Sequence, residues 1–181
     1  EVGSSKNREL AREGVNKSVV LLQNNNILPN SKNIKSILVA GEHGHDLGYQ
    51  CGGWSISWQG GSGNTTIGTT ILDGIRDNIG NQSSVSFSKN GDEPNDHDII
   101  IAVVGETPYA EMKGDSESLE LSNKDKLLLE RLIKTGKPIV LILISGRPMI
   151  ITPYLEHVDA VLAAWLPGTE GSRVADLLFG D

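Results

Sequence analysis

Two uninterrupted apolar runs constrain the fold of this 181-residue chain more than any other feature. They read DIIIAVVG (98–105) and PIVLILIS (138–145), and both are rich in β-branched residues. A run without polar alternation is typical of a strand buried on both faces, as in a parallel sheet covered by helices. The sequence therefore predicts a sheet in the interior of the molecule.

Helical patterns alternate with strand-like runs along the rest of the chain. Further strands are expected at 35–41, 85–88 and 160–168, and helices at 7–24, 69–80, 122–136, 149–157 and 169–180. In the helix at 122–136, the stripe Leu127, Leu128, Leu132 and Ile133 is expected to face the core. The alternation implies βαβ units, and thus an α/β fold with about five mainly parallel strands.

Charge and composition exclude several classes of protein. The net charge is −7, and the 16 Lys and Arg residues are scattered, which argues against a nucleic-acid partner. No apolar run approaches the ~18–20 residues that a membrane span needs. The lone cysteine, Cys51, excludes an internal disulfide framework and a cysteine metal site.

Candidate catalytic groups lie after the strand at 98–105. The acidic loop, GETPYAEMKGDSES (105–118), carries Glu106, Glu111 and Asp115 within ten residues. In parallel sheets, ligand-contacting residues gather on loops that follow the carboxyl ends of strands. One of these carboxyls could act as a general acid or base if its environment raised its pKa. The alternative is a solvated acidic surface loop.

Two indoles on a glycine-rich segment form a second candidate. The tryptophan loop, YQCGGWSISWQGG (49–61), places Trp54 and Trp58 after the first predicted sheet strand at 35–41. Exposed indoles provide flat apolar surfaces suited to the C–H faces of a sugar ring. The alternative is that one or both cover the edge of the core.

The remaining polar clusters favour architecture over chemistry. His43 and His45 lie near Glu42 and Asp46, but nothing in the sequence completes a metal-binding set. The same segment, GEHGHDLG, lacks both common phosphate-loop patterns, which disfavours a flavodoxin-like nucleotide binder. Arg147, in SGRP, is a candidate partner for a buried carboxylate.

Several segments in order resemble the second domain of glycoside hydrolase family 3, in its β-glucan exohydrolase and β-glucosidase branch. They are REGVNKSVVLLQNNNILP, ILVAGEHGHDLGYQCGGWSISWQG, TTIGTTILDGI, VVGETPYAEMKGD, ISGRP, AAWLPGTEG and VADLLFGD. The resemblance implies a three-layer α/β/α sandwich with a mainly parallel sheet of about six strands. It also implies an interdomain helix and linker at 1–34, packed on a sandwich domain at 35–181.

The resemblance further implies a retaining, exo-acting β-glycosidase that acts on β-glucan oligosaccharides or β-glucosides without a metal or organic cofactor. The resemblance also implies a secreted or periplasmic location, and a nucleophile that is an aspartate on a barrel domain. No stretch here reads as such a barrel, which needs at least ~200 residues. The barrel is therefore expected outside this chain, which would be catalytically incomplete alone.

The match of PYAEMKGD to the family pattern implies that Glu111 is the general acid/base, with Glu106 as the runner-up. The match of GGWSISW implies that Trp58 forms one half of an aromatic clamp on the sugar, with Trp54 as its support. A hypothesis from another class is a non-catalytic module that binds glucan through Trp54 and Trp58.

Overall fold

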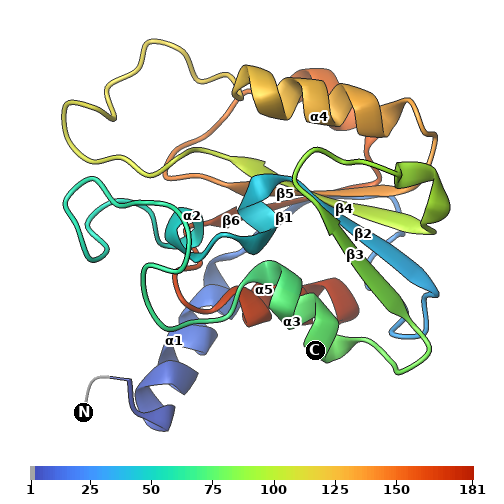
Figure 1. Cartoon of the computed structure of the whole chain (residues 1–181), viewed down its shortest axis with the longest axis horizontal. Helices are drawn as coiled ribbons and strands as arrows, with labels where there is room; N and C mark the ends of the chain where they lie inside the picture. Colours follow the sequence, from blue (N-terminus) through green and yellow to red (C-terminus); the bar gives the residue numbers. More distant parts are fainter. Residues whose placement is uncertain (1–2) are drawn as a thin grey trace.

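The computed structural model describes residues 3–181, which form a three-layer α/β/α sandwich (Figure 1). Its sheet has six strands in the order β1-β6-β5-β4-β2-β3. They are β1 (Val20–Asn24), β2 (Ser36–Ala40), β3 (Ser84–Ser88), β4 (Ile99–Gly105), β5 (Ile139–Ile144) and β6 (Ala160–Trp165). All neighbours pair in parallel except β1, which is antiparallel to β6. The prediction of a mainly parallel sheet of about six strands is confirmed.

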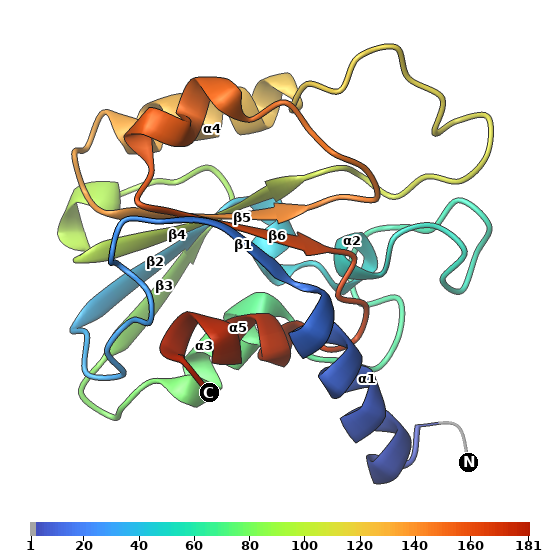
Figure 2. The same cartoon turned by 180° about the vertical axis from the view of Figure 1, so that it is seen from behind.

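Helices cover both faces of this sheet (Figures 1 and 2). On one face lie α1 (Ser5–Ser18), α3 (Ile71–Asn78) and α5 (Gly171–Phe179), and on the other lie α4 (Asn123–Ile133) and the 3-10 helix Thr152–His157. Shorter helices are α2 (Leu47–Cys51) and the 3-10 turns Glu42–His45 and Pro94–Asp96. Alternate β4 side chains enter opposite clusters, Ile99, Ile101 and Val103 toward α3 and α5, and Ile100, Ala102 and Val104 toward α4. This alternation explains why the strand needs no polar residue.

The predicted helix at 7–24 is wrong after Ser18. Helix α1 ends at Ser18, and residues 20–24 form β1, whose Val20 pairs with Ala163 of β6. The β-branched pair Val19 and Val20 fits an extended backbone, and edge pairing satisfies backbone groups that a longer helix would have used. The strand that completes the sheet thus comes from within residues 1–34, the predicted interdomain segment. Residues 1 and 2 of that segment lie outside the described residues.

The predicted apolar stripe on α4 is also partly wrong. Leu127 is 64% exposed, whereas Leu128, Leu129 and Leu132 are buried against the sheet. The buried face of α4 begins at Asp125 and follows helical spacing from there. A leucine one position away from that face points to solvent despite its apolar side chain.

A buried carboxylate fastens α1 to the sandwich. Glu170, at the start of α5, is 1% exposed. Its oxygens lie 3.0 Å from Nη2 of Arg8 and 3.1 Å from Nε of Arg12. Val15 is the one buried residue of α1, so the helix has little apolar packing beside these two ion pairs.

The carboxyl ends of the parallel strands meet at one edge of the sheet. The tryptophan loop follows β2, the acidic loop follows β4, and the segment with Arg147 follows β5. In Figure 1 the first two loops extend from the same end of the molecule. The topology therefore brings together segments that are far apart in sequence. Among the described residues, no helix has the length and apolar character to cross a bilayer.

Candidate functional site

Trp58 and Glu111 are in direct contact although 53 residues separate them. The indole Nε1–H donates a hydrogen bond to Oε2 of Glu111 at 2.6 Å. Trp54 lies beside Trp58, with 6.4 Å between ring centroids and 55° between ring planes. Trp54 is 69% exposed and Trp58 44% exposed. Two indoles and one carboxylate thus form a single exposed cluster.

The tryptophan loop is anchored at its base and bent at its tip. Gln50, which is fully buried, donates to the carbonyls of Thr69 and Gly168 and accepts from the Ile71 amide. At the tip, Trp54 and Ile56 have positive φ of 60° and 67°. These are uncommon for such side chains and mark a bent loop under strain. The role of Gln50 was not predicted.

The tryptophan loop packs directly on the acidic loop. Oε1 of Gln59 accepts from the Ala110 amide at 3.0 Å. A Cβ on Gly53 would lie 2.0 Å from the carbonyl oxygen of Tyr109, so this close approach requires glycine. Neither contact was predicted. The position of Gln59 next to Trp58 in the sequence could have indicated the contact between Gln59 and Ala110.

The hydrogen bond from Trp58 is the main cause that holds the pKa of Glu111 below its ordinary value, and burial opposes it only weakly. Glu111 is exposed, so water also stabilises its charged form. In this chain it is therefore a carboxylate at neutral pH. That is the protonation state of a general base, whereas a general acid needs a raised pKa.

Replacing Trp58 with phenylalanine is expected to raise the pKa of Glu111 toward its ordinary value. The ring is kept, but the N–H that stabilises the carboxylate is lost. Carbon NMR titration of labelled glutamate carboxyls in this chain measures the change. Trp54→Phe should raise the pKa of Glu111 less, because Trp54 lowers that pKa less than Trp58 does. An unchanged Glu111 pKa in Trp58→Phe would contradict the assignment of this contact as the cause.

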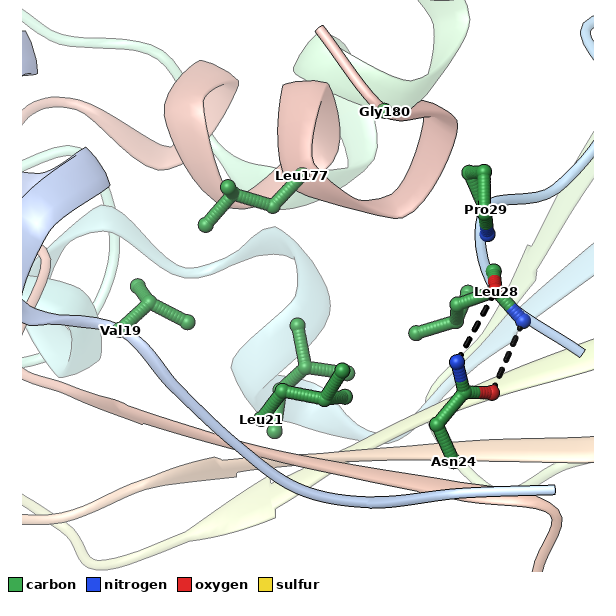
Figure 3. Close-up of a pocket in the computed structure, with 8 residues that line it drawn as sticks. Val19, Leu21, Asn24, Leu28, Pro29, Leu177 and Gly180 are labelled. Atoms are coloured by element: carbon green, nitrogen blue, oxygen red, sulfur yellow. Dashed lines mark hydrogen bonds between the residues drawn. The ribbon is translucent and has the colours of Figure 1, made fainter. Parts of the chain in front are cut away.

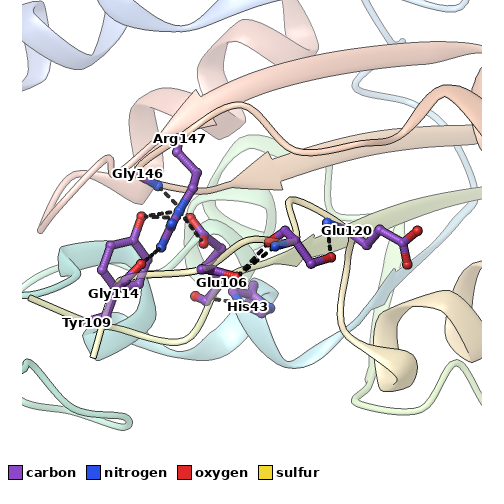
Figure 4. A network of polar contacts seen from close by, with 9 residues as sticks. His43, Glu106, Tyr109, Gly114, Glu120, Gly146 and Arg147 are labelled. Atoms are coloured by element: carbon purple, nitrogen blue, oxygen red, sulfur yellow. Dashed lines mark hydrogen bonds and ion pairs between the residues drawn. The ribbon is translucent and has the colours of Figure 1, made fainter. Parts of the chain in front are cut away.

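Glu106 sits in a different environment from Glu111, shown in Figure 4. Its side chain is 15% exposed, and Oε1 lies 2.9 Å from Nε of Arg147. Oε2 accepts from the Tyr109 hydroxyl at 3.1 Å and from the Gly146 amide at 3.2 Å. The carboxylate therefore has three partners within the domain, including the arginine that the sequence singled out as a candidate partner for a buried carboxylate. This engagement favours a structural role for Glu106.

The two histidines also have local partners. Nε2 of the buried His43 donates to the carbonyl of Glu106 at 3.1 Å, and burial lowers the pKa of His43. Nδ1 of His45 lies 3.0 Å from Oγ1 of Thr70, the cap of α3. Within residues 3–181 no three His, Cys, Asp or Glu side chains cluster in a way that could hold a metal.

Two cavities differ in chemistry. One of about 690 Å³ lies between the acidic loop and the start of α4, and its lining includes His43, Asp125 and Arg147. Another of about 320 Å³ lies between β1 and the end of α5, as Figure 3 shows. Its lining is mostly apolar and contains no titratable side chain. The polar cavity borders the candidate site, and the apolar one has no group for acid–base chemistry.

The model of the glycosyl hydrolase family 3 C-terminal domain matches residues 19–181. The chain belongs to this family. The family 3 domain is 37% identical to the lysosomal beta glucosidase of Dictyostelium discoideum, over 99% of this chain and 25% of that protein. It is 33% identical to a beta-xylosidase of Formosa agariphila, over 100% of this chain and 27% of that protein. It thus spans about a quarter of the length of these relatives.

Solved structures agree in fold. The family 3 domain superposes on an exo-1,3/1,4-beta-glucanase from a Pseudoalteromonas species with a TM-score of 0.90 and 40% identity, covering 98% of this chain and 23% of that one. For a beta-glucosidase from Listeria innocua in complex with gluconolactone, the TM-score is 0.83 and the identity 27%, covering 99% of this chain and 26% of that one. The predicted resemblance to family 3 is confirmed.

Proposed function

We propose that this domain supplies Glu111 as general acid/base, and Trp58 as sugar platform, to the active site of a retaining, exo-acting β-glucosidase. The observation that carries the proposal is the 2.6 Å contact between Trp58 and Glu111 at the exposed end of the sheet. Substrates of the class β-glucan oligosaccharide or β-glucoside agree with the names of the glucosidase and glucanase relatives. The parent enzyme, meaning the full-length protein that carries this domain, would also contain the barrel domain.

The chemistry divides between two carboxyls. A retaining glycosidase needs a nucleophile and an acid/base roughly 5–5.5 Å apart. We assign the nucleophile to an aspartate of the barrel domain and the acid/base to Glu111. Glu111 donates a proton to the leaving oxygen as the glycosyl–enzyme bond forms, and then takes a proton from the water that hydrolyses this bond.

The aspartate of the barrel domain would also explain how Glu111 becomes protonated, as a general acid must be. Glu111 alone has a lowered pKa and would be charged. A nearby aspartate and burial beneath a bound sugar both disfavour the charged form and raise the pKa. Docking against the barrel domain would thus convert Glu111 from a base into an acid. Residues 1–34, with α1 fastened through Glu170, are proposed as the interdomain segment that allows this docking.

The exposed indoles favour a second candidate, a non-catalytic glucan-binding module. The two rings are tilted by 55°, so they do not form one flat platform, which favours a half-site completed by another domain. Titrating this chain with laminari- and cello-oligosaccharides, while following tryptophan fluorescence, separates the two functions. We expect negligible binding at millimolar sugar. Tight binding that is lost in Trp58→Ala would overturn the half-site and support the module.

A further inference from the structure

One arginine contacts the acidic loop on both sides of Glu111. Arg147 follows β5, and its Nε donates to the Tyr109 hydroxyl at 2.9 Å. Its Nη2 donates to the carbonyl of Gly114 at 2.7 Å, and its Nε lies 2.9 Å from Oε1 of Glu106. Figure 4 shows these groups converging. The guanidinium thus joins the beginning, middle and end of the segment that carries Glu111.

Tyr109 is the centre of this arrangement. The Arg147 guanidinium carbon lies 4.2 Å from the centroid of its ring. A Cβ on Gly114 would lie 2.4 Å from the ring, and one on Gly146 would lie 2.9 Å from the hydroxyl. Glycines from two separate segments therefore make room for the side chain, and Arg147 closes over it.

Apart from Arg147, the acidic loop is supported mainly by contacts with the tryptophan loop. It contains no helix or strand after Gly105, apart from a turn in which the Gly114 amide donates to the Ala110 carbonyl at 2.8 Å. Within that turn, Met112 has a positive φ of 68°, a conformation that persists only where the surroundings fix it. The contacts of Arg147 to Tyr109 and Gly114 bracket this strained turn and Glu111 with it.

We propose that Arg147 is a positioning residue that fixes the Glu111 carboxyl for proton transfer. The inference rests on the proposed function, because it presumes that Glu111 is the acid/base. Arginine suits the role because its planar fork contacts a carboxylate, a hydroxyl and a carbonyl in fixed directions, which a lysine ammonium does not do. A displacement of about 1 Å at a reacting group can lower a rate about 10²-fold.

The test compares substrates in the parent enzyme. Arg147→Lys is expected to lower kcat on cellobiose and laminaribiose about 10²-fold, with KM changed by less than about threefold. On a dinitrophenyl β-glucoside, whose leaving group needs no proton, kcat/KM reports formation of the glycosyl–enzyme and should fall less than about fivefold. Tyr109→Phe keeps the ring and removes only the hydroxyl contacts, so a smaller loss with the same substrate dependence is expected. If Arg147→Lys fails to fold, Tyr109→Phe still tests the inference.

The matched control is Arg131→Gln. Arg131, on α4, contacts the Asn90 carbonyl and Asp92 at the surface, and its loss should change no rate by more than about twofold. An equal loss on both substrate classes, or no loss, in Arg147→Lys and Tyr109→Phe would overturn the inference alone, provided Glu111→Ala discriminates between leaving groups. If Glu111→Ala does not discriminate, the proposed function fails and the inference with it.

Discussion

Replacing Glu111 with alanine in the parent enzyme is expected to lower turnover of cellobiose and laminaribiose by about 10²–10⁴-fold. The loss follows from removing the proton that the leaving sugar needs. Activated aryl glucosides should lose far less in the step that forms the glycosyl–enzyme, because their leaving groups depart without a proton. Steady-state kinetics on a series of leaving groups measures the difference.

Azide provides the second measurement on Glu111→Ala. Without a general base, hydrolysis of the glycosyl–enzyme slows, and a small anionic nucleophile that needs no base should partly restore turnover of activated substrates. Glu117→Ala is the matched control, since Glu117 is an exposed carboxylate on the same acidic loop. If turnover of every substrate is untouched in Glu111→Ala, the acid/base lies elsewhere.

Replacing Gly53 with alanine is expected to reduce turnover of the same disaccharides about 10²-fold by separating the two loops. The added Cβ would lie 2.0 Å from the Tyr109 carbonyl oxygen, which is backbone, so the loops must move apart. The contact between Trp58 and Glu111 should weaken with this movement. The pKa of Glu111 in the isolated chain should consequently rise, as carbon NMR titration would show.

Gly14→Ala is the control for this substitution. A Cβ on Gly14, within α1, would meet nothing within 4 Å. The same chemical change should there leave activity intact and stabilise the fold by about 0.5–1 kcal/mol, because alanine favours the helix. Wild-type kinetics in Gly53→Ala would show that the site tolerates separation of the loops.

The interior of the sheet was predictable, and its edge was not. The strands at 99–105 and 139–144 are buried throughout, so their sequences carry the unbroken apolar pattern of a central strand. Strand β1 is largely exposed, and its Leu22 also fits the helical spacing of Val15 and Val19. Its conformation depends on pairing with β6, about 140 residues later, and such a partner leaves no local signal.

The candidate site was also predictable only in part. The residue types on the tryptophan and acidic loops indicated sugar stacking and acid–base chemistry, and the family resemblance selected Trp58 and Glu111 among them. The supports of these residues were largely hidden. Gln59 reaches across 51 residues to Ala110, and Arg147 across 38 to Tyr109. Such contacts arise from strand order, which residue spacing does not encode.

The contacts between the tryptophan loop and the acidic loop limit how the two can move in the parent enzyme. Gly53 abuts Tyr109, Gln59 bonds to Ala110, and Arg147 ties the acidic loop to the end of β5. Trp58 and the Glu111 carboxyl are therefore expected to move together as one rigid body. Release of a bound sugar would then require a hinge between domains, which we propose to lie in the segment 1–34, where α1 buries only Val15.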